Sequence, residues 1–277
     1  ERLVGSEMCI RDSFPALKMG AKLGIPTCVH ESNAVPGLTT KLVARTASRV
    51  MVSFESSREH YPEPEKVLLT GTPVREEFLF AKRQEARQAL GLGEEPLVVS
   101  CWGSLGAREM NKKIAQFMKC ECEENTPFHH IHATGSFGWR WMPEYVKELG
   151  VDLAAHPRID MREYIYDMPQ VLAAADLIVC RAGAATIAEV CASGTPCIMV
   201  PSPNVTGNHQ EKNARVLERS GAAAVVREAD CDGKSLYETA KAILSDAGRM
   251  RAMRASARDM AVVDAAAVSY THLRAHE

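Results

Sequence analysis

The sequence predicts an α/β fold with parallel sheets arranged in two domains. Short apolar runs rich in Val and Ile alternate with helical segments of about 10–15 residues, which is typical of βαβ units and a parallel sheet. A charged helical segment at 79–95 interrupts this alternation and separates a first domain, 14–78, from a second, 96–267. The length of 277 residues suits one large domain or two of ordinary size.

The first domain begins with a helical pattern that ends at Gly24, a typical residue just past a helix end. The elements expected after it are a buried strand over 25–30, a helix over 37–47, and strands over 49–54 and 66–74. We therefore expect a small parallel sheet in this domain.

The second domain repeats the alternation over a longer stretch. The expected elements are a strand, turn and helix over 96–120, a strand at 129–135, a helix at 143–150, a strand and helix over 157–176, a strand, helix and strand over 177–201, a helix and strand over 209–228, and a helical tail. This domain is long enough to bury a core of its own.

Small residues occupy two points of the second domain where a strand gives way to a helix, at 102–107 and at 182–185. Open parallel sheets bind ligands outside the carboxyl ends of their strands, where unpaired amides at helix starts carry partial positive charge. Small side chains let a phosphate approach those amides. Either turn alone is also explained by tight packing, but two in one domain favour a nucleotide diphosphate. Neither matches the dinucleotide or P-loop fingerprint, which argues against an NAD-dependent oxidoreductase.

Polar side chains near the second turn are candidates for ligand contacts. Thr186 can donate a hydroxyl or cap the helix, and Glu189 lies one helical turn beyond Ala185 on the same face. The carboxylate of Glu189 could accept hydrogen bonds from sugar hydroxyls, or it could simply be solvated.

Three further segments carry weaker candidates. His30 stands at the end of a predicted strand, and Arg75 follows a strand and a Pro turn. Gln210 and Asn213 open a helix with i, i+3 spacing, so they could reach a ligand or cap that helix. We expect the cluster His129, His130 and His132 to form a solvated loop and not a metal site.

The composition excludes several classes. A formal charge of −2 gives no reason to expect a nucleic-acid partner. No apolar run approaches the roughly 18 residues that span a bilayer. Nine cysteines without a secretion signal indicate a reduced, cytosolic protein.

The two ends have a common origin in this interpretation. One DNA sequence that encodes residues 3–12 has a complementary strand that encodes the whole of 268–277, and it resembles a transposon-end sequencing adapter. We therefore expect 1–13 and 268–277 to be adapter-derived tails. Cys9, Tyr270, His272 and His276 would then carry no function.

Seven segments, taken in order, are specific to one family: "HESNAVPGLTTKLVAR", "GTPVR", "GSLGA", "YIYDM", "RAGAATIAE", "GTPCIMVPSP" and "HQEKNA". Over residues 14–267 the chain resembles the peptidoglycan N-acetylglucosaminyltransferases of the GT-B superfamily. This resemblance implies two Rossmann-like domains facing each other across a cleft, the first of them incomplete here. It also implies an inverting transfer of N-acetylglucosamine from UDP-GlcNAc to lipid I, forming lipid II at the cytoplasmic face of the bacterial plasma membrane, by a peripheral enzyme without metal or cofactor.

The resemblance also assigns donor contacts by position. Glu189 would hold the ribose hydroxyls, Ile165 would lie against the uracil, and Gln210 would bind the donor sugar. Ser104 and the amides of 184–186 would bind the diphosphate. The full set is Asn33, Arg75, Ser104, Ile165, Ala184, Ala185, Thr186, Ile187, Ala188, Glu189 and Gln210.

Two departures from the family pattern matter. Trp102 replaces a glycine in the first turn, where it could crowd or shift the diphosphate loop. The family's glycine-rich first unit, which carries the general base, is not present, so no catalytic base is assigned and His30 is the only nearby substitute. We therefore expect this chain to bind donor weakly and transfer nothing. Alternatives are the donor-binding subunit of a split GT-B transferase and a related lipid glycosyltransferase.

Overall fold

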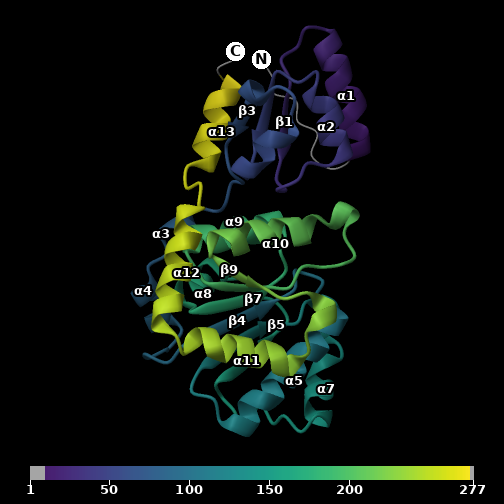
Figure 1. Cartoon of the computed structure of the whole chain (residues 1–277). Helices are drawn as coiled ribbons and strands as arrows, with labels where there is room; N and C mark the ends of the chain where they lie inside the picture. Colours follow the sequence, from purple (N-terminus) through teal and green to yellow (C-terminus); the bar gives the residue numbers. More distant parts are fainter. Residues whose placement is uncertain (1–9, 275–277) are drawn as a thin grey trace.

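The computed structural model describes residues 10–274, with side chains described from 14 to 271. A three-stranded sheet lies at one end of the molecule and a six-stranded sheet at the other (Figure 1). All strand pairs are parallel, as the alternating sequence pattern predicts. The architecture is therefore α/β, with two parallel-sheet units.

The small unit is built on strands in the order β1-β2-β3, with His30 opposite Met51 in the β1–β2 register. Its core is formed by a few apolar side chains, among them Val50, Val52 and Val67. Its elements are α1 (Ile10–Lys22), β1 (Cys28–Glu31), α2 (Leu38–Ala44), β2 (Arg49–Val52), the 3₁₀ turns η1 (Glu55–His60) and η2 (Pro64–Lys66), and β3 (Val67–Leu69).

The large unit has the strand order β6-β5-β4-β7-β8-β9. Its chain therefore starts with β4 in the middle of the sheet, adds β5 and β6 on one side, and then crosses back to add β7, β8 and β9 on the other side. Its strands are β4 (Leu97–Cys101), β5 (His129–Ala133), β6 (Ile159–Arg162), β7 (Leu177–Cys180), β8 (Cys197–Met199) and β9 (Ala223–Val225). Its helices are α5 (Arg108–Glu124), α6 (Ser136–Trp139), α7 (Met142–Glu148), α8 (Met168–Ala174), α9 (Ala184–Ser193), α10 (His209–Ser220), α11 (Gly233–Leu244) and α12 (Ala247–Asp259), with η3 (Thr206–Asn208) and η4 (Glu228–Asp230).

Two separate cores cover the two faces of the large sheet. Successive strand residues point to opposite faces, so Leu97 and Val99 of β4 pack with α8, α9 and α10, whereas Val98 packs with α5 and α11. The core under Leu97 and Val99 is mainly aliphatic, whereas the core under Val98 also contains aromatic side chains such as Phe117 and Tyr237. Helices bury both faces of this sheet, which explains why its strands are continuous apolar runs in the sequence.

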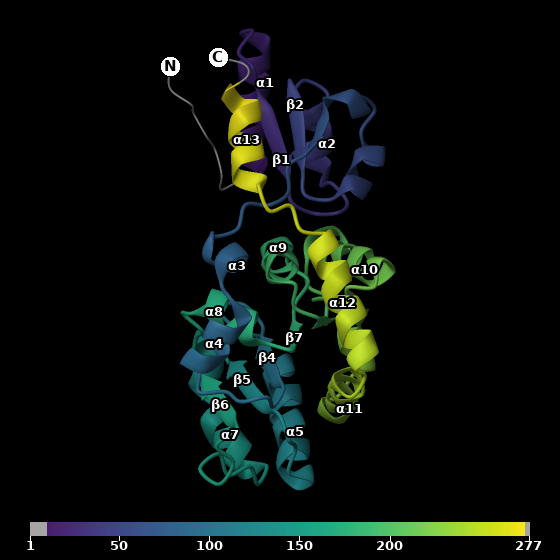
Figure 2. The same cartoon turned by 90° about the vertical axis from the view of Figure 1, so that its left-hand side faces the viewer.

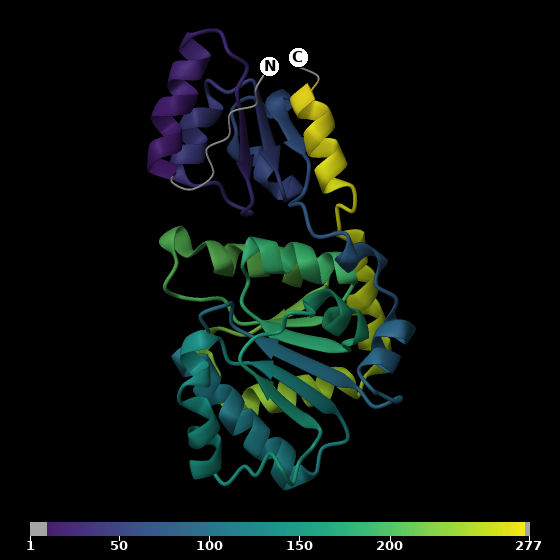
Figure 3. The same cartoon turned by 180° about the vertical axis from the view of Figure 1, so that it is seen from behind.

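Two connections join the units, and Figure 2 shows both. The first runs from β3 through α3 (Glu77–Phe80) and α4 (Arg83–Ala89). The second leaves α12 and leads to α13 (Ala265–Arg274), which lies beside the small sheet on the side away from α1 (Figure 3). The connections touch, because a Cβ added at Gly71 would lie 2.6 Å from the Cβ of Val262.

From the sequence we expected residues 268–277 to be an adapter-derived tail outside the fold. In the structure, the part of this tail that is described forms a helix together with the residues before it. Residues 268–274 continue α13 from the Ala-rich run at 265–267, a composition that favours helix. Tyr270 belongs to this helix. Cys9, His276 and the side chain of His272 lie outside the described residues.

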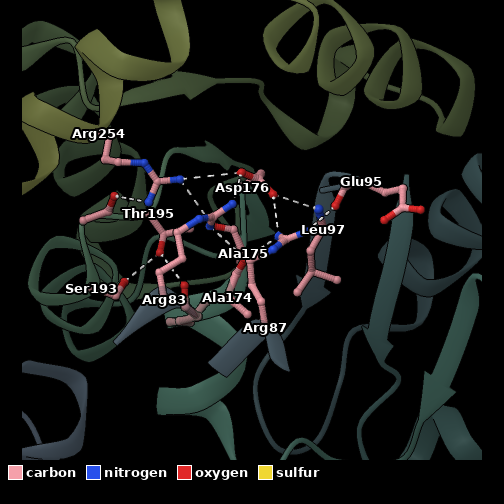
Figure 4. A network of polar contacts seen from close by, with 12 residues as sticks. Arg83, Arg87, Glu95, Leu97, Ala174, Ala175, Asp176, Ser193, Thr195 and Arg254 are labelled. Carbon is pink, nitrogen blue, oxygen red and sulfur yellow. Dashed lines mark hydrogen bonds and ion pairs between the residues drawn. The ribbon is translucent and has the colours of Figure 1, made fainter. Parts of the chain in front are cut away.

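Asp176 ties both connections to the amino edge of the large sheet (Figure 4). Its carboxylate accepts hydrogen bonds from Arg83 at 2.6 Å and Arg87 at 3.2 Å, both on α4, and from the backbone N–H of Leu97 at 2.9 Å. Arg254 of α12 lies 3.8 Å away. One carboxylate therefore fixes the elements that enter and leave the large unit.

Candidate functional site

The two small-residue turns open at the same edge of the large sheet. Their strands, β4 and β7, are neighbours in register, and the last residue of one pairs with the last residue of the other, Cys101 with Cys180. Burial raises the pKa of Cys101 to about 12, and the charge of Glu189 adds to this shift. The two turns therefore follow neighbouring strands at one edge, where a single ligand can meet both, and Glu189 lies on α9, the helix that the second turn begins.

The first turn is held in a conformation that glycine favours. Gly103 and Gly106 have φ of 82° and 78°, and the N–H of Gly106 donates to the carbonyl of Gly103 at 3.1 Å. A Cβ on Gly106 would lie 2.1 Å from the carbonyl oxygen of Thr134, so the turn packs directly against the loop after β5. Ser104 is exposed at its tip. The hydroxyl and neighbouring amides therefore face outward.

The second turn begins α9 without a capping side chain. Gly183 is the N-cap residue, with an extended backbone and no side-chain hydrogen bond to the first turn of the helix. Thr186 therefore does not cap the helix, which was one of two roles expected for it. The first amides of a ten-residue helix remain available to an anion, with Ala185 exposed beside them.

Glu189 and Arg75 come together although 114 positions separate them in the sequence. Burial raises the pKa of the Glu189 carboxyl, and the positive charge of Arg75 partly offsets this shift. The guanidinium of Arg75, which is exposed, lies 5.2 Å from the ring centroid of Phe78 at the start of the first connection. The carboxylate is consequently half desolvated and short of partners.

Three side chains of the run 184–189 point away from this carboxylate. Ala184, Ile187 and Ala188 line a largely apolar cavity of about 350 Å³ between the two units, together with residues such as Phe54 and Met260. Only the main chain of these three positions is placed to meet a ligand at the turn.

Asn33 reaches the large unit through Asn213. The side-chain oxygen of Asn213 accepts from the N–H of Ala34 at 2.8 Å, and its amide donates to Asn33 Oδ1 at 3.1 Å and to the carbonyl of Ala182 at 3.3 Å. Asn213 is fully buried, so it neither caps α10 nor contacts a ligand, the two roles considered for it. It connects the units just behind the second turn.

Glu31 and Gln210 shape the loops around this connection. The buried carboxylate of Glu31 accepts from the N–H and side-chain amide of Asn33 at 3.0 and 3.1 Å, and from the N–H of Gly37 at 3.1 Å. Gln210 Oε1 accepts from the N–H of Ser202 at 2.8 Å. Sequence reasoning missed Glu31, although it stands inside the quoted segment "HESN".

The side chain of Ile165 faces the core, so the expected contact between this residue and a base stays a prediction and would have to use the main chain. Ile165 is 2% exposed and packs in the core with Val171 and Ile187. Its neighbours Tyr164 and Tyr166 are exposed, with ring centroids 4.9 Å apart. A base at this loop would meet main chain or tyrosine rings, because the alternating loop turns the isoleucine inward.

The histidine cluster lies on the strand predicted for 129–135, which is confirmed, and the solvated loop expected for these histidines is wrong. His130 and His132 lie on β5, and the hydroxyl of Ser100 on β4 is 2.7 Å from a ring nitrogen of each. His130 Nδ1 is 3.0 Å from Glu121. Burial, with the neighbouring His130, lowers the pKa of His132 to about 3. Within residues 10–274, no group of three or more His, Cys, Asp or Glu side chains is arranged to hold a metal ion.

Two other residues are engaged in ways the sequence did not indicate. His30 Nε2 lies 2.9 Å from the carbonyl oxygen of Gly71. Because a carbonyl oxygen only accepts hydrogen bonds, the nitrogen in this contact carries the proton. Trp102 is 5% exposed and packs with Val98 and Met110 in the core behind the first turn. It does not crowd the mouth of that turn, because its position continues the inward-facing alternation of Val98 and Ser100 on β4.

Comparison with known families and structures agrees with this geometry. The glycosyltransferase family 28 C-terminal domain matches residues 97–268, and the N-terminal domain of the same family matches 3–52. The crystal structure of MurG from Acinetobacter baumannii superposes with a TM-score of 0.75 at 26% identity, covering 95% of this chain and 71% of that one. The UDP co-structure of MnaA from S. aureus gives a TM-score of 0.67 at 14% identity, a likeness of fold alone. Fold and site together define a GT-B glycosyltransferase of family 28.

Curated relatives narrow the assignment. UDP-N-acetylglucosamine–N-acetylmuramyl-(pentapeptide) pyrophosphoryl-undecaprenol N-acetylglucosamine transferases from Caldanaerobacter subterraneus and Acetivibrio thermocellus are 41% and 39% identical over 252 residues, 91% of this chain. The chain spans 68% and 67% of their lengths. It belongs to the MurG family, whose reaction forms lipid II in peptidoglycan synthesis. None of the described helices is long and apolar enough to cross a membrane.

Proposed function

We propose that this chain binds UDP-GlcNAc at the carboxyl edge of the large sheet. The observation that carries the proposal is the pair of uncapped, small-residue turns on the adjacent strands β4 and β7, with Glu189 beside them. The diphosphate lies on the amides of both turns and on Ser104. Glu189 accepts hydrogen bonds from the ribose hydroxyls.

The remaining donor contacts come from the loops around these turns. The uracil lies against the main chain at Ile165, beside the exposed rings of Tyr164 and Tyr166. Asn33 and Gln210 contact the donor sugar, and Arg75 supplies positive charge near the phosphates. Amides 184–189 contribute through the main chain, since the side chains of Ala184, Ile187 and Ala188 face the cavity between the units.

The turns also suit the charge change of the transfer. As the glycosidic bond to UDP breaks, negative charge grows on the leaving diphosphate. Fixed amide dipoles aimed at that charge stabilise it without reorganisation and without a cation. We propose that donor binding needs neither a metal nor a cofactor.

The acceptor of the family reaction is lipid-linked, so we propose that the enzyme works peripherally at the cytoplasmic face of the bacterial membrane. Transfer of the acceptor hydroxyl's proton needs a base. His30 does not supply one through Nε2, because that nitrogen already bears a proton directed at the Gly71 carbonyl. We propose that this chain binds donor and does not turn over lipid I.

Calorimetry with UDP tests the donor site. We expect heat of binding in EDTA as large as in Mg²⁺, and a loss of binding in Glu189→Gln. Glu124→Gln is the matched control, because Glu124 pairs with Lys241 at the far end of α5. No binding by the folded wild-type chain would contradict the proposal. Product formation from a lipid I analogue would contradict the absence of turnover.

A further inference from the structure

Trp102 and Arg181 occupy equivalent places at the start of the two turns. Trp102 is the first residue after β4 and Arg181 the first after β7. The guanidinium carbon of Arg181 lies 5.6 Å from the centroid of the Trp102 rings, within the range of a cation–π contact. Both side chains lie on the buried side of the two turns: 5% of Trp102 and 14% of the Arg181 side chain are exposed.

Arg181 is also fastened to the loops after the next two strands. Its Nη1 donates to the carbonyl of Val200, after β8, at 3.0 Å. The same group forms an ion pair of 2.6 Å with Glu228, after β9. Lys113 of α5 donates to the main-chain oxygen of Glu228. One guanidinium therefore joins the loops after β4, β7, β8 and β9, and Lys113 adds the helix that follows the first turn.

This arrangement fixes geometry more than it adds stability. A largely buried ion pair gains little net stability, because desolvation offsets the attraction between its charges. A flat indole face and a planar guanidinium, by contrast, allow few relative positions. The contact between them therefore limits the distance between the residue that opens one turn and the residue that opens the other.

We propose that Trp102 is a positioning residue for the donor diphosphate. It acts through Arg181 by holding the two turns at the separation that lets both sets of amides meet one ligand. This inference rests on the proposed donor site. In this chain the coupling between the two turns runs through an indole ring. Binding groups must be held within about 0.5 Å of the productive geometry, so a small slip between the turns weakens binding.

UDP affinity of Trp102 variants, measured by calorimetry, tests the proposal. We expect Trp102→Leu to bind UDP about tenfold more weakly, because leucine lacks a flat face for the guanidinium. Trp102→Phe keeps such a face and should remain within about threefold of the wild type. Phe128→Leu is the matched control: Phe128 is also 5% exposed in the same core, but it precedes β5 at the opposite edge of the sheet. It should lose stability without losing UDP affinity.

Hydrogen exchange provides a readout that a general loss of stability would not mimic. The amides of Gly106 and Ile187, which donate to the carbonyls of Gly103 and Gly183, should exchange faster together in Trp102→Leu and stay as in the wild type in Phe128→Leu. If Trp102→Leu does not fold, Arg181→Lys takes its place, with an expected loss of about fivefold.

The outcomes separate the two proposals. A folded Trp102→Leu with wild-type UDP affinity, or an equal loss of affinity in Phe128→Leu, overturns the positioning role while leaving the donor site intact. Failure of the wild-type chain to bind UDP overturns the donor site itself.

Discussion

The two edges of the large sheet differ in how completely their polar groups are paired. At the amino edge, Asp176 accepts from two arginines and a backbone N–H, and a third arginine approaches it. At the carboxyl edge, α9 starts without a capping side chain, and burial raises the pKa of Glu189 with a partial offset from the positive charge of Arg75. The first edge contributes stability, and the second leaves polar groups unpaired where we propose that the donor binds.

Because of this difference, we expect substitutions at the two edges to have different effects on stability and on ligand binding. Removing a charge at the amino edge leaves arginines without their partner, whereas removing one at the carboxyl edge relieves a desolvated group. Stability and binding should therefore respond at opposite edges, and the following predictions are ordered by the size of the expected effect.

The largest effect should come from Asp176→Ala. We expect a loss of about 3 kcal/mol in the free energy of unfolding, because Arg87 and the Leu97 N–H lose a buried acceptor. Denaturant unfolding measures this loss, and UDP affinity of the folded fraction should not change. Asp176→Asn, which keeps an acceptor for Leu97, should lose less. A smaller loss for alanine than for asparagine would contradict this account of the amino edge.

Glu189→Gln should do the reverse. We expect UDP affinity to fall at least tenfold, because a hydrogen bond to a charged acceptor contributes about 1.5–3 kcal/mol. Stability at neutral pH should stay the same or rise. A carboxyl whose pKa is raised by folding contributes stability only at low pH, and that contribution is lost as pH rises through the raised pKa. A thermal shift assay measures the stability of Glu189→Gln, and calorimetry measures its UDP affinity. Lower stability with unchanged affinity would show that Glu189 contributes to stability and not to binding.

The pH dependence of UDP binding should follow the same carboxyl. Affinity should decrease as pH falls through the pKa of Glu189, with a midpoint above the ordinary value of 4.5 because burial raises that pKa. Titration calorimetry at several pH values measures the midpoint. The dependence should disappear in Glu189→Gln, and its persistence there would assign it to another group.

The smallest effect is expected from Gly183→Ala. Gly183 has φ of −68°, and an added Cβ would meet only Thr186 Oγ1, at 3.8 Å, so the fold has room for it. A methyl group there would still stand where a phosphate approaches the first amides of α9. We expect an unchanged unfolding midpoint and about a threefold loss of UDP affinity. Equal affinity would mean that the diphosphate lies elsewhere.

The sequence determined those features that depend on local order. Alternation of apolar and helical segments predicted both parallel sheets, and small residues at 103–106 and 182–185 predicted two turns at a carboxyl edge. Glu189 followed from helical spacing alone. The strands, helices and turns were predicted correctly because strand and helix periods are set by the backbone, whereas the ligand contacts at this edge stay a prediction.

Only the tertiary structure decided which side chains face the ligand and which face the core. The inward side of Ile165, the burial of His130 and His132, and the connection made by Asn213 each depend on a neighbour far away in the sequence. For Trp102, the alternation along β4 gives the inward direction, and only its contact with Arg181, 79 positions later, depends on the tertiary structure. Packing between distant segments selects the orientation of a side chain, and no local pattern contains that information.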